Sequence, residues 1–155
     1  MNQKKSALKR VVANFKRVKI LVIGDLILDE FIWGRVSRIS PEAPVPVVWV
    51  NSESFMPGGA ANVASNIHAL GADAFICGVI GSDSRGRVIT DELRRKNIDV
   101  EGIVIDNERP TTLKTRVIAH HQQVVRIDRE KVDEIDDNII GQMVTFIKEK
   151  ISEVD

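Results

Sequence analysis

Two apolar segments constrain the fold of this chain more than any other feature of its sequence. Residues 19–25 and 74–80 have the length of strands and carry continuous apolar runs, as strands covered on both faces of a sheet require. Helices are predicted over about 59–70 and about 84–97, and a third short strand over 100–105. This alternation predicts an α/β protein with a parallel sheet and helices on its faces.

Other segments do not fit that sheet. Residues 31–50 contain three prolines among aromatic and β-branched residues, which predicts strands outside it. Residues 112–119 and 123–128 alternate in polarity on either side of a His-His-Gln turn, which predicts a β-hairpin. Helices over about 6–17 and 136–151 complete the chain. Because the chain stops just after a helix, where the alternation predicts another strand, residues 1–155 are expected to be truncated.

Composition excludes several classes of protein. The chain has 155 residues, enough for one domain with a core, and 22 basic residues balance 22 acidic ones, so nothing global favours nucleic acid or an anionic membrane. The single Cys77 excludes an internal disulfide, and its apolar surroundings predict a buried, inert thiol. No segment approaches the roughly 20 apolar residues of a membrane span, and no secretory leader is recognisable. We expect a cytoplasmic protein without nucleic-acid or membrane partners.

A glycine pair before a small-residue helix is the best candidate for a ligand site. Gly58 and Gly59 allow backbone to approach a ligand where a Cβ would clash, and they leave helix N-terminal amides free to bind it. Asn62, one turn later, offers an amide donor and an acceptor. The arrangement suits a hydroxyl-rich small molecule. A plain loop-to-helix entry is the alternative.

Asp29 follows the first strand by a few residues, near the edge where open α/β sheets bind ligands. Its carboxylate can accept hydrogen bonds from two vicinal hydroxyls of a sugar. A helix or turn cap explains an aspartate at this position equally well.

Basic residues on the predicted hairpin form a second candidate. Lys114 and Arg116 are two residues apart, so both side chains leave the same face of a strand, and Arg126 lies on the opposing strand. Two cations on one face suit a phosphate, although a solvated strand face is the ordinary alternative. His120 and His121 lie in the turn without further residues at metal-ligand spacing, so no metal site is predicted. The common local motifs of nucleotide sites do not occur.

These residues converge on a known family. The run from Gly58 to Ala64, with Gly71 and Gly81 at matching intervals, resembles the N-terminal signature of the ribokinase-like (PfkB) carbohydrate kinases. Four further segments are similar to the heptose 7-phosphate kinase branch of that family: residues 24–29, 37–48, 110–117 and 122–128. The resemblance covers about residues 18–151.

The resemblance implies a ribokinase-like parallel-sheet core with helices on both faces, and a small β-sheet lid built from about residues 31–50 and 112–127. It implies that sugar hydroxyls are held by Asp29, Gly58, Gly59 and Asn62. The basic residues Lys114, Arg116 and Arg126 would approach the sugar from the lid, where its phosphate would lie. Since lids of this family often pair between subunits, a homodimer through the lid is also implied.

The implied activity is ATP-dependent phosphorylation of D-glycero-D-manno-heptose 7-phosphate at its anomeric hydroxyl, giving the 1,7-bisphosphate for ADP-heptose and lipopolysaccharide core synthesis. Kinases of this family carry a Gly-Ala-Gly-Asp signature, the ATP pocket and the residues that place Mg²⁺ in their C-terminal half. None of these occurs in residues 1–155. We therefore expect no catalytic residue and no activity in this chain alone. The alternatives are a non-catalytic sugar-phosphate-binding or dimerising module, and a related kinase with another sugar phosphate.

Overall fold

The computed structural model describes residues 2–155, with the side chains of residue 6 and of residues 8–155. Strands β1 (Lys19–Ile23), β4 (Asp73–Gly81) and β5 (Asp99–Asp106) form one sheet in the order β1-β4-β5, and both neighbouring pairs are parallel. The two apolar segments that were predicted as buried strands are β1 and β4. The predicted parallel sheet is therefore confirmed.

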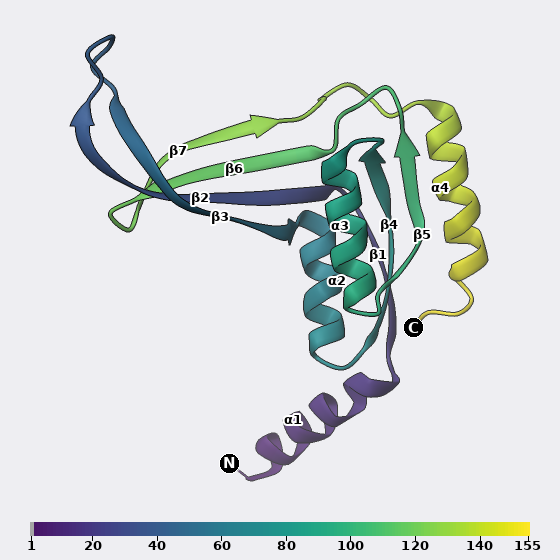
Figure 1. Ribbon diagram of the computed structural model, residues 1–155. Coiled ribbons are helices and arrows are strands. Elements are labelled where there is room, and N and C mark those ends of the chain that lie inside the picture. The colour runs from purple at the N-terminus through teal and green to yellow at the C-terminus, as the bar shows by residue number, and fades with distance from the viewer. Residues whose placement is uncertain (1) are drawn as a thin grey trace.

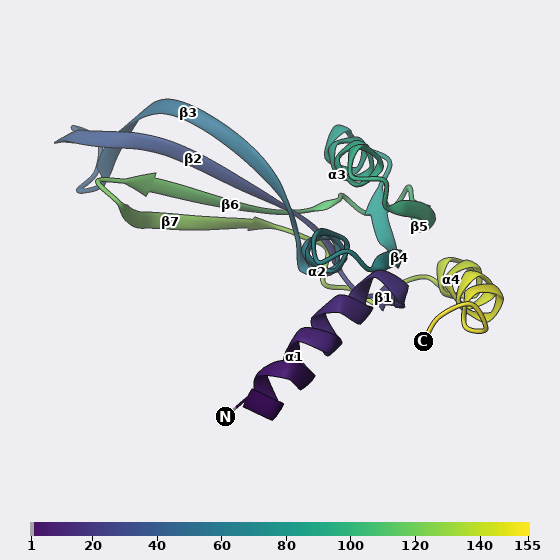
Figure 2. The ribbon, with the colours of Figure 1, turned by 90° about the horizontal axis from the view of Figure 1, so that it is seen from below.

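Helices cover both faces of this sheet, as predicted (Figures 1 and 2). Helices α2 (Gly59–Ala69) and α3 (Ser84–Arg95) lie on one side, and α4 (Asp137–Lys150) lies on the other. The buried side chains that α2 presents to the core are small: Ala60, Ala61, Ala64 and Ser65. They let the helix approach the strands closely. On the far side, Gly102 of β5 leaves room for the ring of Phe146 in α4.

Four strands form a second sheet that extends from the core as an arm (Figure 1). They are β2 (Leu26–Ile39), β3 (Pro46–Gly58), β6 (Thr112–Ala119) and β7 (Gln122–Arg129), in the order β3-β2-β6-β7. Two antiparallel hairpins, β2–β3 and β6–β7, are joined by parallel pairing of β2 with β6. We call this sheet the lid. The predictions of strands outside the main sheet and of a hairpin after residue 112 are both confirmed.

One expectation about the lid is wrong. Asp29 was expected in a turn beyond the first strand, with a cap as the alternative, but it lies inside β2, which already begins at Leu26. The reason is that Leu26 and Leu28 alternate with outward-facing neighbours and are almost completely buried, with 2% and 1% exposure. These leucines extend the hydrophobic core to the base of the lid.

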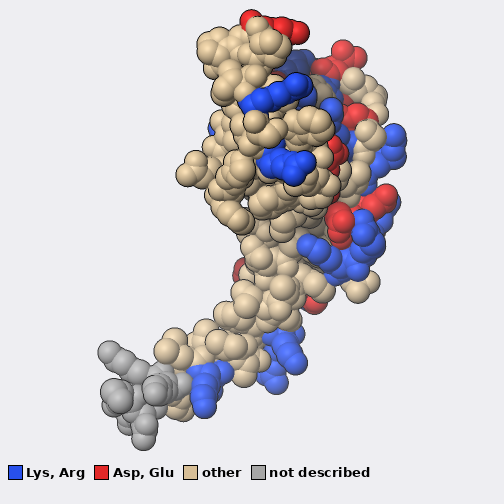
Figure 3. All heavy atoms as spheres, turned by 60° about the vertical axis from the view of Figure 1, so that its left-hand side comes forward, with Lys and Arg blue, Asp and Glu red and all other residues tan. Residues whose placement is uncertain are grey.

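The periphery contains a helix and two unpaired strand edges. Helix α1 (Asn2–Asn14) continues into a short 3₁₀ turn, η1 (Phe15–Arg17), and projects away from the core (Figures 1 and 2). Lys and Arg side chains lie along its described part (Figure 3).

Strands β1 and β5 each have one neighbour in the described sheet, and Ile23 and Ile105 on them are about half exposed, 52% and 55%.

Asp83 connects the core to the lid. As the N-cap of α3 it accepts a hydrogen bond from the Gly86 amide at 2.9 Å, and it also accepts from the Thr111 amide and hydroxyl at 3.0 and 2.8 Å. Thr111, 1% exposed, immediately precedes β6. Burial tends to raise the pKa of Asp83, but these hydrogen bonds and the charge of Arg85 outweigh it and hold that pKa below its ordinary value. Asp83 thus fixes where the lid leaves the core.

Replacing Asp83 with alanine should lower the free energy of unfolding of this chain by about 2–4 kcal/mol near pH 7, because a helix cap is lost and buried Thr111 groups lose their partner. A lowered pKa in the folded state adds stability above the unfolded pKa of about 4, and this stability is lost as pH falls through the folded value. The difference in free energy of unfolding between wild type and Asp83→Ala should therefore become smaller below about pH 4. Urea denaturation measures this difference. Asp91→Ala, in the same helix but exposed, should change little at any pH. If this difference in free energy stays constant down to pH 2, the ionised Asp83 carboxylate does not have the proposed stabilising role.

Candidate substrate-binding site

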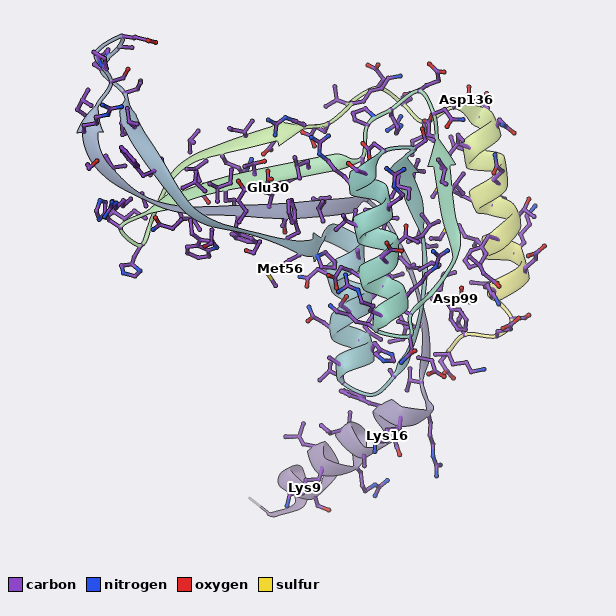
Figure 4. All side chains as sticks on the ribbon, in the orientation of Figure 1. Lys9, Lys16, Glu30, Met56, Asp99 and Asp136 are labelled. Atoms are coloured by element: carbon purple, nitrogen blue, oxygen red, sulfur yellow. The ribbon has the colours of Figure 1, made fainter. Side chains whose placement is uncertain are left out.

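One face of the lid gathers nearly all the predicted polar site residues. In the β2 register, Asp29 lies between Met56 of β3 and Lys114 of β6, and Arg116 of β6 lies opposite Arg126 of β7. Because side chains alternate along strands, a common face is shared by Asp29, Met56, Lys114, Arg116, Arg126 and Asp128. We call it the polar lid face. Figure 4 shows Met56 and Glu30 leaving the lid on opposite sides. The predicted shared face of Lys114 and Arg116 is confirmed.

Asp29 lies directly against the glycine pair. A Cβ on Gly58 would come within 2.6 Å of Asp29 Oδ2 and 2.9 Å of Asp29 Cγ, so only glycine lets the carboxylate occupy this position. The other oxygen, Oδ1, accepts a hydrogen bond from Arg116 Nη1 at 2.6 Å. The structure therefore brings together Asp29 and Gly58, two residues that the sequence singled out for the same sugar.

Gly59 begins α2 in a conformation that other residues rarely adopt. Its φ is +54°, and a Cβ there would overlap the carbonyl oxygen of Asp25. The same carbonyl accepts a hydrogen bond from the Ala60 amide at 2.9 Å. Asn62, one turn into α2, is exposed, and its Oδ1 accepts from Asn66 Nδ2 at 3.4 Å. The glycine pair thus joins the end of β3 to a helix N-terminus beside Asp29.

The three predicted phosphate ligands have carboxylate partners. Lys114 Nζ contacts Asp128 at 3.1 Å and Glu130 at 3.2 Å, and Arg126 Nε contacts the other oxygen of Asp128 at 2.9 Å. The hydrogen bond to Asp128 chiefly raises the pKa of Lys114, and the hydrogen bond from Lys114 chiefly lowers that of Asp128. The raised pKa of Lys114 favours its charged form. A bound phosphate would have to share or replace their carboxylates.

A cavity of about 360 Å³ adjoins the polar lid face at its base. Its lining includes Asp25, Ile27, Thr112 and Lys114, and the segment 130–135 closes another side. Asp25 was not among the predicted site residues, although its place at the carboxyl end of β1 is where open α/β sheets bind ligands. Its exposed side chain also lines a neighbouring cavity of about 170 Å³.

The described residues show no reactive cysteine, no cluster suited to a metal ion and no membrane-spanning helix. Cys77 is buried, and burial raises the pKa of its thiol, as expected of an inert cysteine. Across residues 2–155 no group of three or more His, Cys, Asp or Glu is arranged to hold a metal ion. None of the described helices is both long and apolar enough to cross a membrane.

Comparison with solved structures defines the class of fold. The chain aligns with Arabidopsis thaliana ribokinase complexed with ribose and ATP (14% identity, TM-score 0.58, 81% of this chain and 42% of that one). It also aligns with Halothermothrix orenii fructokinase (22% identity, TM-score 0.54, 79% of this chain and 42% of that one). At these identities the likeness establishes the fold, which is the ribokinase-like α/β fold predicted from the sequence.

The chain belongs to the pfkB family of carbohydrate kinases, whose sequence pattern matches residues 17–142. It is also 51% identical over 137 residues to the bifunctional protein HldE of Helicobacter pylori strain J99, covering 88% of this chain and 30% of that protein. The chain therefore spans about a third of the length of such relatives. The family resemblance drawn from the glycine signature is confirmed, and the family is one of carbohydrate kinases.

Proposed function

We propose that this chain is the sugar-binding N-terminal part of an ATP-dependent kinase for D-glycero-D-manno-heptose 7-phosphate, which it converts to the 1,7-bisphosphate for ADP-heptose and lipopolysaccharide core synthesis. The observation that carries the proposal is the position of Asp29, which is bonded to Arg116 of the lid and extends into the space that the missing Cβ of Gly58 leaves. The choice of heptose rests on the lid segments 37–48 and 110–128, which resemble the heptose kinase branch. Family membership supports the kinase class.

The proposed recognition divides the sugar between two surfaces. Asp29 accepts hydrogen bonds from vicinal hydroxyls, while the Gly58 and Gly59 backbone and the Asn62 amide bind others at the start of α2. The phosphate lies toward the lid, where Lys114 and Arg126 supply positive charge. The carboxylates of Asp128 and Glu130 hold these cations until the phosphate arrives.

ATP and Mg²⁺ are the proposed cofactors of the complete kinase. ATP supplies the transferred phosphoryl group and Mg²⁺ neutralises charge as it moves. Because the resemblance places the catalytic base and the residues that position Mg²⁺ in the C-terminal half of these kinases, we propose neither Mg²⁺ ligands nor a catalytic base within this chain. The contribution of residues 1–155 is to bind the sugar and to cover it.

We further propose that the kinase is a cytoplasmic homodimer joined through the lid. The face opposite the polar lid face carries apolar side chains that are 41–45% exposed: Phe55, Val125 and Ile127. Across the strands of this face, Val125 pairs with Val117, while Phe55 and Ile127 pair with Glu30 and Thr115. A second lid of the same composition would remove this apolar surface from water.

The direct test is turnover by the complete kinase that contains this segment. With ATP and a panel of sugar phosphates, we expect heptose 7-phosphate to be consumed fastest and ³¹P NMR to report the 1,7-bisphosphate. Faster turnover of another sugar phosphate would replace the proposal with a related kinase. Binding of heptose 7-phosphate without any ATP-dependent product would favour a non-catalytic module.

A further inference from the structure

Arg116 differs from the other two cations of the polar lid face in what it contacts. Its Nη1 lies 2.6 Å from Asp29 Oδ1, and the side chains are only 24% and 22% exposed. The residues belong to neighbouring strands, and their register offset places the guanidinium diagonally across from the carboxylate. Lys114 and Arg126, in contrast, pair with acidic residues on or just after β7.

The surroundings of Arg116 fix this orientation. Its guanidinium carbon lies 5.4 Å from the centre of the Phe31 ring, and Nη1 also donates to the Lys114 carbonyl at 3.3 Å. The ring and the carbonyl direct Nη1 toward Asp29. The carboxylate extends into the space that a Cβ on Gly58 would fill. Asp29 is therefore held by Arg116 before any sugar is present.

The charges on this face argue against a second role for Arg116. Its three cations, Lys114, Arg116 and Arg126, pair with Asp29 and Asp128 on the face and with Glu130 just beyond β7, and the partner of Arg116 is Asp29 itself. A phosphate that captured Arg116 would leave the carboxylate that binds hydroxyls without its partner. A phosphate that captured Lys114 or Arg126 would displace only Asp128 or Glu130, which have no proposed contact with the sugar.

We propose that Arg116 is a positioning residue that acts through Asp29 and does not bind the phosphate of the substrate. It holds Oδ1 so that Oδ2 and the remaining lone pairs of the carboxylate meet the sugar hydroxyls in a fixed orientation. This inference rests on the proposed sugar-binding function. It reassigns one of the three cations that the sequence placed beside the phosphate.

The test compares a ligand with and without phosphate. In the complete kinase, Arg116→Gln should weaken binding of heptose 7-phosphate and of unphosphorylated heptose by the same factor, about tenfold or more for a lost charge-assisted contact. Arg126→Gln, its cross-strand neighbour, is the matched control and should weaken only the phosphorylated ligand. Arg116→Lys should restore part of the loss for both ligands. If Arg116→Gln weakens only the phosphorylated ligand, Arg116 binds phosphate and the proposal is overturned.

A second measurement separates this inference from the proposed function. Without ligand, the unfolding free energies of Asp29→Asn, Arg116→Gln and the double variant of this chain form a double-mutant cycle. We expect the double variant to lose less than the sum of the single losses. The cycle of Asp29→Asn with Arg126→Gln should be additive. Additivity in the Arg116 cycle would overturn the inference even if heptose binds, whereas coupling without heptose binding would overturn only the proposed substrate.

Discussion

Replacing Gly59 with alanine is expected to destabilise this chain by about 2 kcal/mol or more and to disrupt the start of α2. A residue other than glycine at a φ of +54° costs about 1–3 kcal/mol, and the added methyl group would also overlap the Asp25 carbonyl. That carbonyl belongs to backbone and already accepts the Ala60 amide, so it has no low-cost route away. Urea denaturation measures the loss, and amide hydrogen exchange in residues 60–64 should rise most.

Gly141 provides a matched control for this substitution. It lies inside α4, and a Cβ there would have no atom within 4 Å apart from its own helix. Gly141→Ala should therefore raise the free energy of unfolding by about 0.5–1 kcal/mol, since alanine favours a helix more than glycine does. Equal effects of the two substitutions would contradict the close approach of Gly59 to Asp25.

Replacing Asp29 with alanine in the complete kinase should raise KM for the sugar phosphate about 10- to 150-fold. A hydrogen bond to a charged group contributes about 1.5–3 kcal/mol, and the carboxylate is proposed to accept at least one from the sugar. Steady-state kinetics at saturating ATP measure the change. Asn62→Asp should also raise KM, because it replaces the amide NH₂ donor of the side chain with a negatively charged carboxylate oxygen.

Glu30→Ala is the control for Asp29→Ala. Glu30 is the next residue of β2, but its side chain leaves the opposite face of the lid and accepts a hydrogen bond from Thr115 (Figure 4). We expect its removal to affect stability and to leave KM close to that of the wild type. Unchanged kinetics in both Asp29→Ala and Asn62→Asp would remove these residues from the site.

Local patterns were sufficient to predict most elements of the fold. The apolar runs of β1 and β4, the small residues of α2 and the alternation in β6 and β7 are all visible within ten residues of sequence. The start of β2 was missed because Leu26, Ile27 and Leu28 are all apolar. Their alternation in burial appears only when the core is present.

The partners of the site residues could not be predicted in the same way. Asp29 and Arg116 are 87 residues apart, and their contact depends on the parallel register of β2 with β6. The alternation rule gave the face of each side chain, but it carries no information about which residues of another strand lie opposite. Sequence alone therefore identified the cations of the lid without revealing that each has a carboxylate beside it.

The parallel pairing of β2 with β6 has a consequence for the order in which the molecule folds. Each lid hairpin consists of local contacts, but the chain between Ile39 and Thr112 includes β3, α2, β4, α3 and β5. The two hairpins can align only after these elements have folded back on themselves, because closing so long a loop costs entropy that only the folded core repays. We therefore expect Asp29 and Arg116 to meet late in folding. A core substitution far from the lid that slows this step would delay the appearance of sugar binding, even if it leaves every residue of the site unchanged.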